Sequence, residues 1–371
     1  MSEHRSAEAP PVGARGTKRA PWVKVASVAI SVLLVVGIFV FAIPRIASYG
    51  EVLDTLRDLT WIELWSLLLA TFFNLFTYWL ANMAALPGLQ LSRAAVITQT
   101  TTTVANTLPA GGAIAVGLTY DMLHSWGFTT NASTLYVLVT GFWNIFMKLA
   151  LPVLSVAILA LTGQSSTVFL AAAVIGVVVL TIAIGVFAAI LWKEHLARRI
   201  GDLAGRLIAA VLKPFRRRAP SGMGDRAVRF RRDTIGLIER RWLALTVTTA
   251  VSQLALFFVL LLSLRHVGVS EAEVSTAQLL AVFAFGRLLS TVPITPGGLG
   301  VIELGYIGGL VAAGGAQPDV VAGVLLFRVL TYGIQIPIGG VTYLIWKRKR
   351  SWRLPVPSRS VPDERLSEVR P

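Results

Sequence analysis

The sequence predicts an all-α, polytopic membrane protein with about eight hydrophobic segments, two of which form opposed broken or re-entrant hairpins in an inverted repeat. Three observations predict this fold. The 371 residues are 55% hydrophobic and only 14% charged, whereas about 25% of the residues in a soluble globular protein are charged. The basic residues gather in three segments, and Gly-Pro breaks occur in both halves of the chain. This composition excludes an ordinary soluble enzyme and also a disordered chain, which would be poor in apolar residues.

Six stretches of at least about 20 largely apolar residues are long enough to cross a hydrocarbon core of about 30 Å. They are residues 22–43, 61–86, 132–161, 166–192, 242–264 and 319–346. The first stretch is too long for a removable signal peptide, and no clear small-residue cleavage site follows it. Residues 22–346 are therefore expected to form one transmembrane domain.

The net charge of +15 is spread unevenly along the chain. Residues 1–24 carry +3, residues 193–241 carry +9 and residues 347–371 carry +5, which leaves −2 for everything else. Basic loops stay in the cytoplasm by the positive-inside rule, so we expect both termini and the loop 193–241 on the cytoplasmic side. Residues 1–21 and 347–371 are then basic, disordered cytoplasmic tails. Nucleic-acid binding is not expected, because it requires a basic face on a folded soluble domain.

This orientation determines where two further segments enter the membrane. The two predicted spans 132–161 and 166–192 cross the membrane and return, so residue 130 must lie on the same cytoplasmic side as the basic loop. The span 61–86 also ends on that side, so segment 93–120 must enter and leave on the cytoplasmic side. The same reasoning requires segment 276–315 to enter and leave on the outer side. Each segment is either a re-entrant hairpin or a pair of spans broken in the middle.

Both segments carry helix breakers at their middle. The first reads ANTLPAGGAIAVG over residues 105–117, and the second reads STVPITPGGLGVIELG over residues 290–305. Gly- and Pro-interrupted segments in corresponding positions of two halves are the best sequence indication of a transporter's binding site. A second interpretation is that the Pro-Gly clusters are simple interfacial turns. The predicted breaks are Pro109, Gly111, Gly112, Pro293, Pro296, Gly297, Gly298 and Gly300.

Few charged residues lie inside the predicted membrane segments: Lys148, Arg287, Glu303 and Arg328. Such residues are costly and usually functional. We expect Arg287 and Arg328 to bind an anionic head group, because the planar arginine fork grips phosphate with two hydrogen bonds. Glu303 would balance them by pairing with one of the two arginines. The alternative is that the pair is a structural clamp that locks the hairpin.

The run from Thr98 to Thr103 is unusually polar for membrane depth. With Asn106, residues such as Thr102 are expected to line a hydrophilic path for a head group. The alternative is that the threonine hydroxyls bond to carbonyls four residues earlier in the same helix. In the basic loop, residues 201–218 resemble an amphipathic helix suited to anionic lipid, or alternatively a cytoplasmic helix that packs on the bundle.

No enzymatic activity, metal or cofactor is expected. The sequence contains no HExxH, GxSxG or Walker motif, and with no cysteine it excludes thiolate chemistry and cysteine-ligated zinc. Proton coupling through Glu303 and downhill exchange both remain open as driving forces.

The stretch RLLSTVPITPGGLGVIELG, followed by LLFRVLTYGIQIPIGG, resembles the lysylphosphatidylglycerol synthase transmembrane region. The most specific part is the Pro-Gly-Gly-Leu-Gly-x-x-Glu core over residues 296–303, and the resemblance covers roughly residues 22–346. It implies a bacterial plasma-membrane protein that is linked to lipid translocation. The aminoacyl-transferase domain of two-part members is absent from this sequence, so lysine transfer to lipid is not expected.

The leading hypothesis is a flippase that moves an anionic or zwitterionic phospholipid, or a lipid-linked glycan, between leaflets. Its partners would be membrane lipids and their anionic head groups. The head group would enter between the two hairpins, where half-helix N-termini after Gly112 and Gly298 supply positive dipole ends. Two alternatives are a secondary transporter of a small solute and a non-transporting membrane partner of a lipid or envelope synthesis complex, in contact with a lipid-synthesis enzyme.

Overall fold

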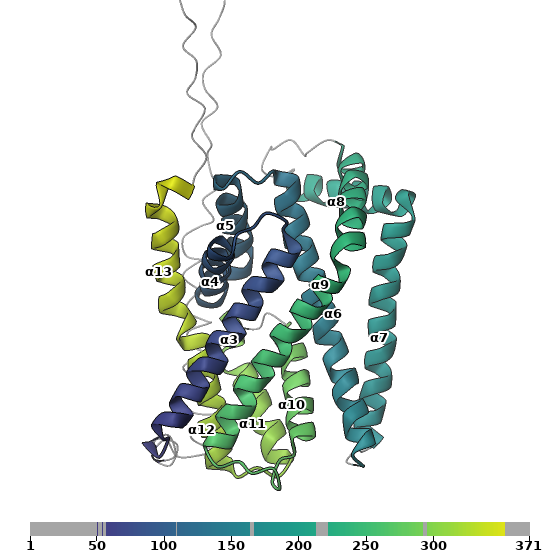
Figure 1. Ribbon diagram of the computed structural model, residues 1–371. Helices are drawn as coiled ribbons and strands as arrows, with labels where there is room; N and C mark the ends of the chain where they lie inside the picture. Colours follow the sequence, from purple (N-terminus) through teal and green to yellow (C-terminus); the bar gives the residue numbers. More distant parts are fainter. Residues whose placement is uncertain are drawn as a thin grey trace, which may run out of the picture.

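The computed structural model describes residues 50, 54, 57–108, 110–163, 167–212, 222–291 and 295–352, and every regular element in them is helical (Figure 1). The α-helices are α3 (Trp61–Ala85), α4 (Leu91–Thr107), α5 (Gly111–Ser125), α6 (Thr130–Leu161), α7 (Thr167–Trp192), α8 (Glu194–Leu212), α9 (Met223–His266), α10 (Thr276–Leu289), α11 (Val301–Ala312), α12 (Gln317–Arg328) and α13 (Gln335–Arg348). Short 3-10 turns, η4 (Pro296–Gly298) and η6 (Arg350–Trp352), and a π-helical turn, η5 (Val329–Gly333), complete the described chain. The predicted tail 1–21, the predicted span 22–43, Pro109, Pro293 and the tail beyond residue 352 lie outside the described residues.

Five helical segments in the described chain are long and apolar enough to cross a membrane: Trp61–Ala85, Thr130–Leu161, Val174–Trp192, Met223–His266 and Gln317–Arg348. They coincide with five of the six predicted spans, so the all-α, multi-pass prediction is confirmed for this part of the chain. None of the residues Val174–Trp192 in α7 is buried. A helix that is apolar all round and uncovered by protein is suited to a lipid environment.

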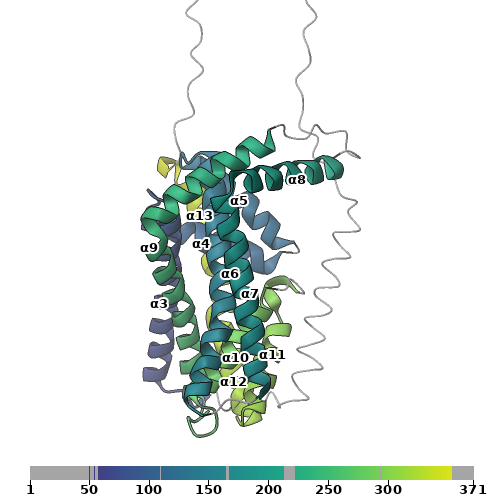
Figure 2. The same cartoon turned by 90° about the vertical axis from the view of Figure 1, so that its right-hand side faces the viewer.

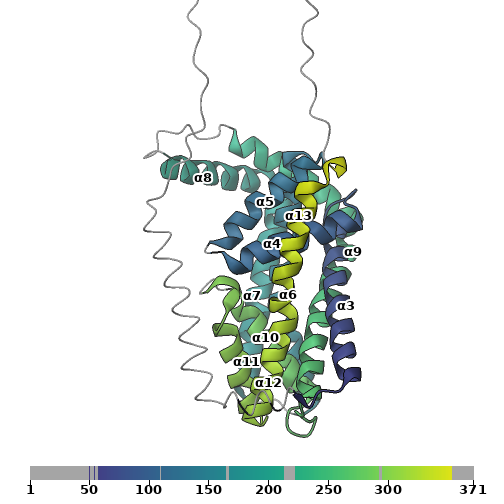
Figure 3. The ribbon, with the colours of Figure 1, turned by 90° about the vertical axis from the view of Figure 1, so that its left-hand side faces the viewer.

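Two pairs of short helices lie in opposite halves of the bundle. Helices α4 and α5 occupy the upper half in Figure 1, whereas α10 and α11 occupy the lower half; Figure 3 shows the same separation from another side. By contrast, α3, α6 and α7 each extend over most of its height (Figure 1). The breaks between the short helices therefore lie at an intermediate level, where both pairs end.

Local sequence explains where several helices begin. Thr60 and Ser275 form capping boxes with Glu63 and Gln278 at the starts of α3 and α10, and the Thr129 hydroxyl accepts a hydrogen bond from the Ala132 backbone N–H at the start of α6.

Each half of the bundle has its own apolar core. One cluster contains Leu260, Phe283, Leu310 and Val324 from α9 to α12. The other contains buried residues of α3, α4, α5 and α6, including Ala85, Ile97, Leu123 and Val139. Because helices in a bilayer associate through van der Waals packing and interhelical hydrogen bonds, these two clusters make the halves partly separate packing units.

Helices α12 and α13 together form one long, interrupted span. In the π-turn between them, the Ile334 backbone N–H donates to the Val329 carbonyl at 2.9 Å, a bond over five residues. Helix α13 then packs closely on α4 (Figure 3). A Cβ atom at Gly339 would lie 2.0 Å from the Thr103 hydroxyl, so only glycine permits this approach.

The region predicted as a basic loop, residues 193–241, is largely helical. Helix α8 runs across the upper end of the bundle, beside the first part of α9 (Figure 2). The amphipathic helix expected over 201–218 begins earlier, at Glu194, and its contacts with α9 support the alternative in which it packs on the bundle. Residues 213–221 lie outside the described chain.

Helix α9 is longer than a membrane crossing requires. Its 44 residues span about 66 Å at a rise of about 1.5 Å per residue. The predicted span 242–264 corresponds to the second half of α9. The first half carries many charged residues, which lower its hydropathy but do not interrupt the helix. In the basic part, Arg231 donates to the carbonyl oxygens of Leu191 and Trp192 at 2.7 and 3.2 Å. This cation therefore caps the C-terminus of α7, where helix carbonyls are unsatisfied.

Candidate functional site

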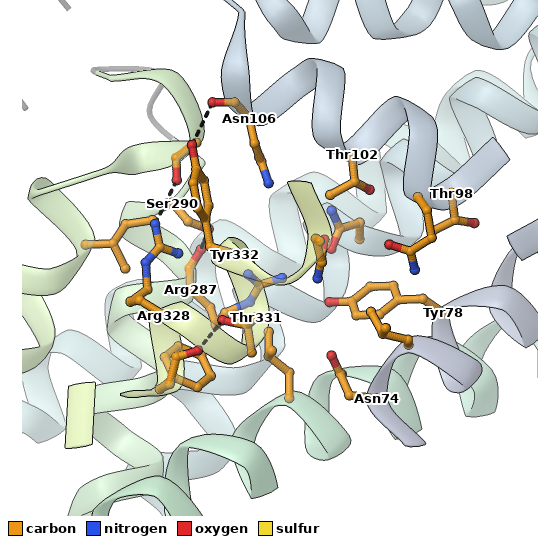
Figure 4. Close-up of a pocket in the computed structure, with 18 of the residues that line it drawn as sticks. Asn74, Tyr78, Thr98, Thr102, Asn106, Arg287, Ser290, Arg328, Thr331 and Tyr332 are labelled. Carbon is orange, nitrogen blue, oxygen red and sulfur yellow. Dashed lines mark hydrogen bonds between the residues drawn. The ribbon is translucent and has the colours of Figure 1, made fainter. Parts of the chain in front are cut away.

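A polar cavity of about 350 Å³ lies among the broken helices. In Figure 4, Tyr78 of α3 and Thr98 and Thr102 of α4 lie on one side of it, and Arg328 and Tyr332 lie on the other. Five of the six predicted substrate-binding residues line this cavity: Thr102, Asn106, Lys148, Arg287 and Arg328. The sixth, Glu303, is bonded to one of them. The structure therefore brings together residues from both halves of the sequence.

Glu303 and Arg328 form a buried ion pair between α11 and α12. The Nε atom of Arg328 donates to Oε1 of Glu303 at 2.6 Å. The Glu303 side chain is 0% exposed and that of Arg328 is 14% exposed. Between the two partners that sequence analysis left open for Glu303, the structure selects Arg328. The second carboxylate oxygen, Oε2, is buried and has no hydrogen-bond partner within the described residues.

Two further contacts hold the Arg328 guanidinium in place. Its second terminal nitrogen donates to the Gly297 carbonyl at 3.2 Å, and its carbon lies 4.9 Å from the centre of the Tyr332 ring. Gly297 has a φ of +63°, and a Cβ atom there would lie 2.4 Å from the Tyr332 ring. Glycine is therefore required both by the left-handed backbone and by the close approach of the ring. The predicted break at Gly297 thus helps to position the arginine.

Arg287 belongs to a different chain of contacts. Its Nε atom donates to Oε1 of Gln253 at 3.0 Å, and Nε2 of Gln253 donates to Oδ1 of Asn144 at 3.1 Å. This chain connects α10 through α9 to α6. The amide satisfies one donor of Arg287 without neutralising its charge, so the guanidinium remains a net positive group beside the cavity.

The charges around the cavity are unbalanced. Lys148, Arg287 and Arg328 supply three cations, whereas Glu303 supplies one carboxylate, giving a formal charge of +2. Lys148, Arg287 and Arg328 are partly buried, so their like charges repel one another more strongly than they would in water. Among the described residues, the arrangement is therefore best completed by an anion from outside the chain.

The polar stretch of α4 serves two purposes. The hydroxyls of Thr98 and Thr101 donate to the carbonyls of Ala94 and Ile97, four residues earlier, as the back-bonding interpretation requires. Thr98 and Thr102 also line the cavity, as the polar-path interpretation requires.

Gln99 adds an unsatisfied polar group beside this stretch of α4. Gln99 lines the cavity and is 1% exposed, and its Oε1 atom has no partner in the described chain.

The predicted breaks lie at helix ends, with small shifts in position. Helix α5 begins at Gly111, two residues before the expected start after Gly112. A Cβ atom at Gly111 would lie 2.3 Å from the Val104 carbonyl, so this position requires glycine. Helix α11 begins at Val301, after Gly298 and the cap residue Gly300, which both have positive φ. Glu303 lies in the first turn of α11, so a carboxylate already faces the positive end of that helix dipole. The half-helix N-terminus expected after Gly298 is therefore present, with Glu303 at its positive end.

Sequence reasoning missed several uncharged residues around the cavity. Asn74, Tyr78, Asn144 and Gln335 line it, and Gln253 orients Arg287. An amide inside a long apolar stretch is the available signal, because polar side chains in membrane helices usually bond to a neighbouring helix. Within the described residues, no group of three or more His, Asp or Glu is placed to hold a metal ion.

The sequence model of the family described as the lysylphosphatidylglycerol synthase TM region matches residues 25–339. This range includes every described residue that lines the cavity. No curated protein matches the chain.

Proposed function

Because the chain belongs to the lysylphosphatidylglycerol synthase transmembrane family, we propose that it is a flippase that moves lipids with an anionic or zwitterionic head group between the leaflets of a bacterial plasma membrane. The observation that carries this proposal is the cavity with three cations and one carboxylate, lined by helices of both halves. A phosphate group supplies the missing negative charge, and its oxygens accept hydrogen bonds from arginine donors.

In the proposed mechanism, Lys148, Arg287 and Arg328 hold the phosphate of the head group. Glu303 keeps Arg328 oriented and limits how tightly the cavity retains the anion. This balance matters because a site that binds too strongly cannot release its cargo. In this mechanism the chain binds and releases the lipid without covalent chemistry, and it acts as a transporter.

The pairs α4–α5 and α10–α11 would be re-entrant hairpins of an inverted repeat. Support comes from their positions in opposite halves of the bundle (Figure 1) and from the separate apolar core of each half. Rocking of one half against the other around the cavity would then expose it alternately to the two leaflets, as in other transporters built from inverted repeats.

The end of the bundle that carries α8 would face the cytoplasm, together with both termini. Support comes from the charges at the two ends. Helix α8 and residues 223–241 of α9 carry nine arginines and five acidic residues, whereas the loop 267–275 at the opposite end carries two glutamates and no basic residue. This distribution agrees with the positive-inside rule.

Reconstitution into proteoliposomes tests the function. The readout is the rate at which acyl-labelled phospholipids become accessible to a membrane-impermeant quencher, for the wild-type chain and for Arg287→Ala and Glu303→Gln. We expect both variants to reduce translocation about tenfold or more, as loss of a charged hydrogen bond of roughly 1.5–3 kcal/mol implies. Arg57→Ala is the matched control, because Arg57 is exposed and pairs only with Asp54 in the described chain.

Three outcomes would contradict the proposal. Translocation that both variants leave unchanged would remove the assigned site. Uptake of inorganic phosphate without movement of any lipid would instead assign the chain to the transport of small solutes. Absence of both activities, with Arg287→Ala and Glu303→Gln tolerated in cells, would favour a non-transporting role.

A further inference from the structure

A second cavity, of about 380 Å³ and lined by both apolar and uncharged polar side chains, adjoins the cationic cavity. It is lined by residues of α3, α4, α5, α6 and α9. Of the described residues that line it, none is Asp, Glu, Lys, Arg or His. We call it the neutral cavity. Its polar atoms belong to hydroxyl and amide side chains, such as Thr119, Thr140, Thr249 and Ser252.

The two cavities share a wall. Tyr78, Thr98, Thr102 and Asn144 line both of them. Gln253 lines the neutral cavity and accepts a hydrogen bond from Arg287, which lines the cationic one. The two cavities are therefore neighbours, and a ligand that occupied both would pass along these shared side chains.

The neutral cavity offers both donors and acceptors. The hydroxyls of Thr119 and Thr140 donate to carbonyls of their own helices, so their oxygens face a ligand as acceptors. Asn82 joins the hydroxyls of Thr98 and Tyr136 in a hydrogen-bonded network. The Thr102 and Thr249 hydroxyls make no such bond within the described residues and can still donate. Alternating donors and acceptors match the hydroxyl groups of a polyol or sugar.

An ammonium group fits this space poorly. It would need acceptors with negative charge, and the single carboxylate nearby, Glu303, is already bonded to Arg328. It would also lie close to three cations, Lys148, Arg287 and Arg328, and be repelled by them.

We propose that the head group of the translocated lipid is a phosphate ester whose other substituent is an uncharged polyol or sugar. The phosphate lies among Lys148, Arg287 and Arg328, and the hydroxyl groups lie in the neutral cavity. This inference rests on the proposed function and narrows it, because it excludes head groups that carry an amine. The same chemistry occurs in phosphatidylglycerol and in a polyprenyl phosphate sugar.

The test compares four labelled lipids in proteoliposomes that contain the full chain. Phosphatidylglycerol and a glucosylated polyprenyl phosphate carry hydroxyl-rich substituents, phosphatidic acid carries the phosphate alone, and phosphatidylethanolamine carries an amine. We expect at least one of the first two lipids to move about tenfold faster than the last two, the gain from one or two additional hydrogen bonds. Which of the first two moves identifies the source of the head group.

A variant of the neutral cavity provides a second readout. Thr249→Val keeps the shape of the side chain and removes a hydroxyl from the neutral cavity. It should slow the hydroxyl-rich lipid several-fold and leave the residual rate of phosphatidic acid unchanged. Thr248→Val is the matched control, because the Thr248 hydroxyl is bonded to the Ala244 carbonyl outside both cavities. If Thr249→Val fails to fold, Thr140→Val provides the same test, because Thr140 lines the neutral cavity and not the cationic one.

The outcomes separate this inference from the proposed function. Equal rates for all four lipids would leave a flippase in place and overturn the assignment of its substrate. The same conclusion follows if Thr249→Val slows phosphatidic acid as much as the hydroxyl-rich lipid, since the effect would then come from packing. Absence of movement for every lipid would overturn the proposed function itself, and the inference with it.

Discussion

The hydroxyl of Tyr332 donates to the backbone carbonyl of Asn106 at 2.8 Å (Figure 4). Tyr332 belongs to the π-turn of the second half, and Asn106 lies in the last turn of α4 in the first half. The last carbonyls of a helix have no partner within the helix, so this bond satisfies one of them. It also ties the two halves together at the edge of the cationic cavity.

Loss of this bond should loosen the contact between the halves. Tyr332→Phe removes the hydroxyl while retaining the ring beside Arg328, and we expect it to lower the free energy of unfolding by about 1 kcal/mol. Thermal unfolding in detergent measures the effect. Tyr343→Phe is the control, because the contacts of Tyr343 that the structure describes are made by its ring. Equal stability of the two variants would show that the Tyr332 bond contributes nothing.

The pair of Glu303 and Arg328 can be tested with a double-mutant cycle. Arg328→Gln leaves a fully buried carboxylate without its cation, and we expect a cost of about 3–5 kcal/mol. The double variant Glu303→Gln/Arg328→Gln removes both charges and should unfold at a higher temperature than Arg328→Gln alone. A sum of single effects equal to the double effect would exclude the coupling.

The same double variant separates a clamp from a binding site. If the pair only locks α11 against α12, the neutral pair should translocate lipid at close to the wild-type rate once it is folded. The proposed mechanism requires the Arg328 charge, so we expect translocation to remain at least tenfold slower in the double variant than in the wild type. Proteoliposomes prepared below the unfolding temperature of the variant provide the measurement.

Lys148 should affect stability and transport in opposite directions. Lys148 and Arg287 line the same cavity and repel each other, so Lys148→Met removes an unfavourable interaction from the unliganded protein. We expect the unfolding temperature to stay the same or rise, while lipid translocation falls about tenfold because a phosphate contact is lost. Lys193→Met is the control for loss of a lysine, because Lys193 is exposed and lies between α7 and α8. A large loss of stability in Lys148→Met would show that Lys148 is instead satisfied within the protein.

The stability of the loop between α9 and α10 should depend on pH through the carboxylate of Glu271. The backbone N–H and hydroxyl of Thr276 donate to its carboxylate at 2.8 and 2.7 Å, and Arg265 pairs with it. Hydrogen bonds from Thr276, followed by the charge of Arg265, lower the pKa of Glu271 from its ordinary value of 4.5. Its contribution to stability is therefore complete above that ordinary value and is lost as the pH falls through the lowered value.

Glu271→Gln tests this dependence. At neutral pH the variant should unfold at a slightly lower temperature than the wild type, a modest effect because the carboxylate is largely exposed. The difference should vanish in strong acid, where the wild-type carboxylate is also neutral. Asp58→Asn, at an exposed position, is expected to change neither value. A difference that persists in acid would mean that the carboxylate charge is not the cause.

Single cysteines test the orientation of the bundle. Because the sequence has no cysteine, labelling of Ser125→Cys or Ser270→Cys reports one position only. We expect an impermeant maleimide to label position 270 in intact cells and position 125 only after the membrane is opened. The reverse result at either position would contradict the proposed inverted hairpins.

The sequence predicted the spans well because length and hydropathy decide whether a helix can cross a bilayer. It placed Lys148, Arg287 and Arg328 near one site because charges are rare at membrane depth. It could not choose the partner of Glu303, since Arg287 and Arg328 are expected at similar depth and only side-chain packing distinguishes them. Gln253 was missed because a single amide changes neither charge nor helical periodicity. The full length of α9 was missed because charged residues end an apolar stretch of sequence but do not end a helix.

The π-turn at Val329–Gly333 has a consequence for the register of everything after it. A π-turn contains one residue more than the α-helical turn it replaces. Gln335, Gly339 and Thr342 face α4 only because of that extra residue: Thr103 bonds to the Gln335 carbonyl, and Thr100 bonds to Thr342. If this turn became α-helical with its length unchanged, α13 would rotate by about 100° and lose these contacts with α4. Deletion of one residue from the turn should instead restore a regular helix and keep the same face of α13 against α4.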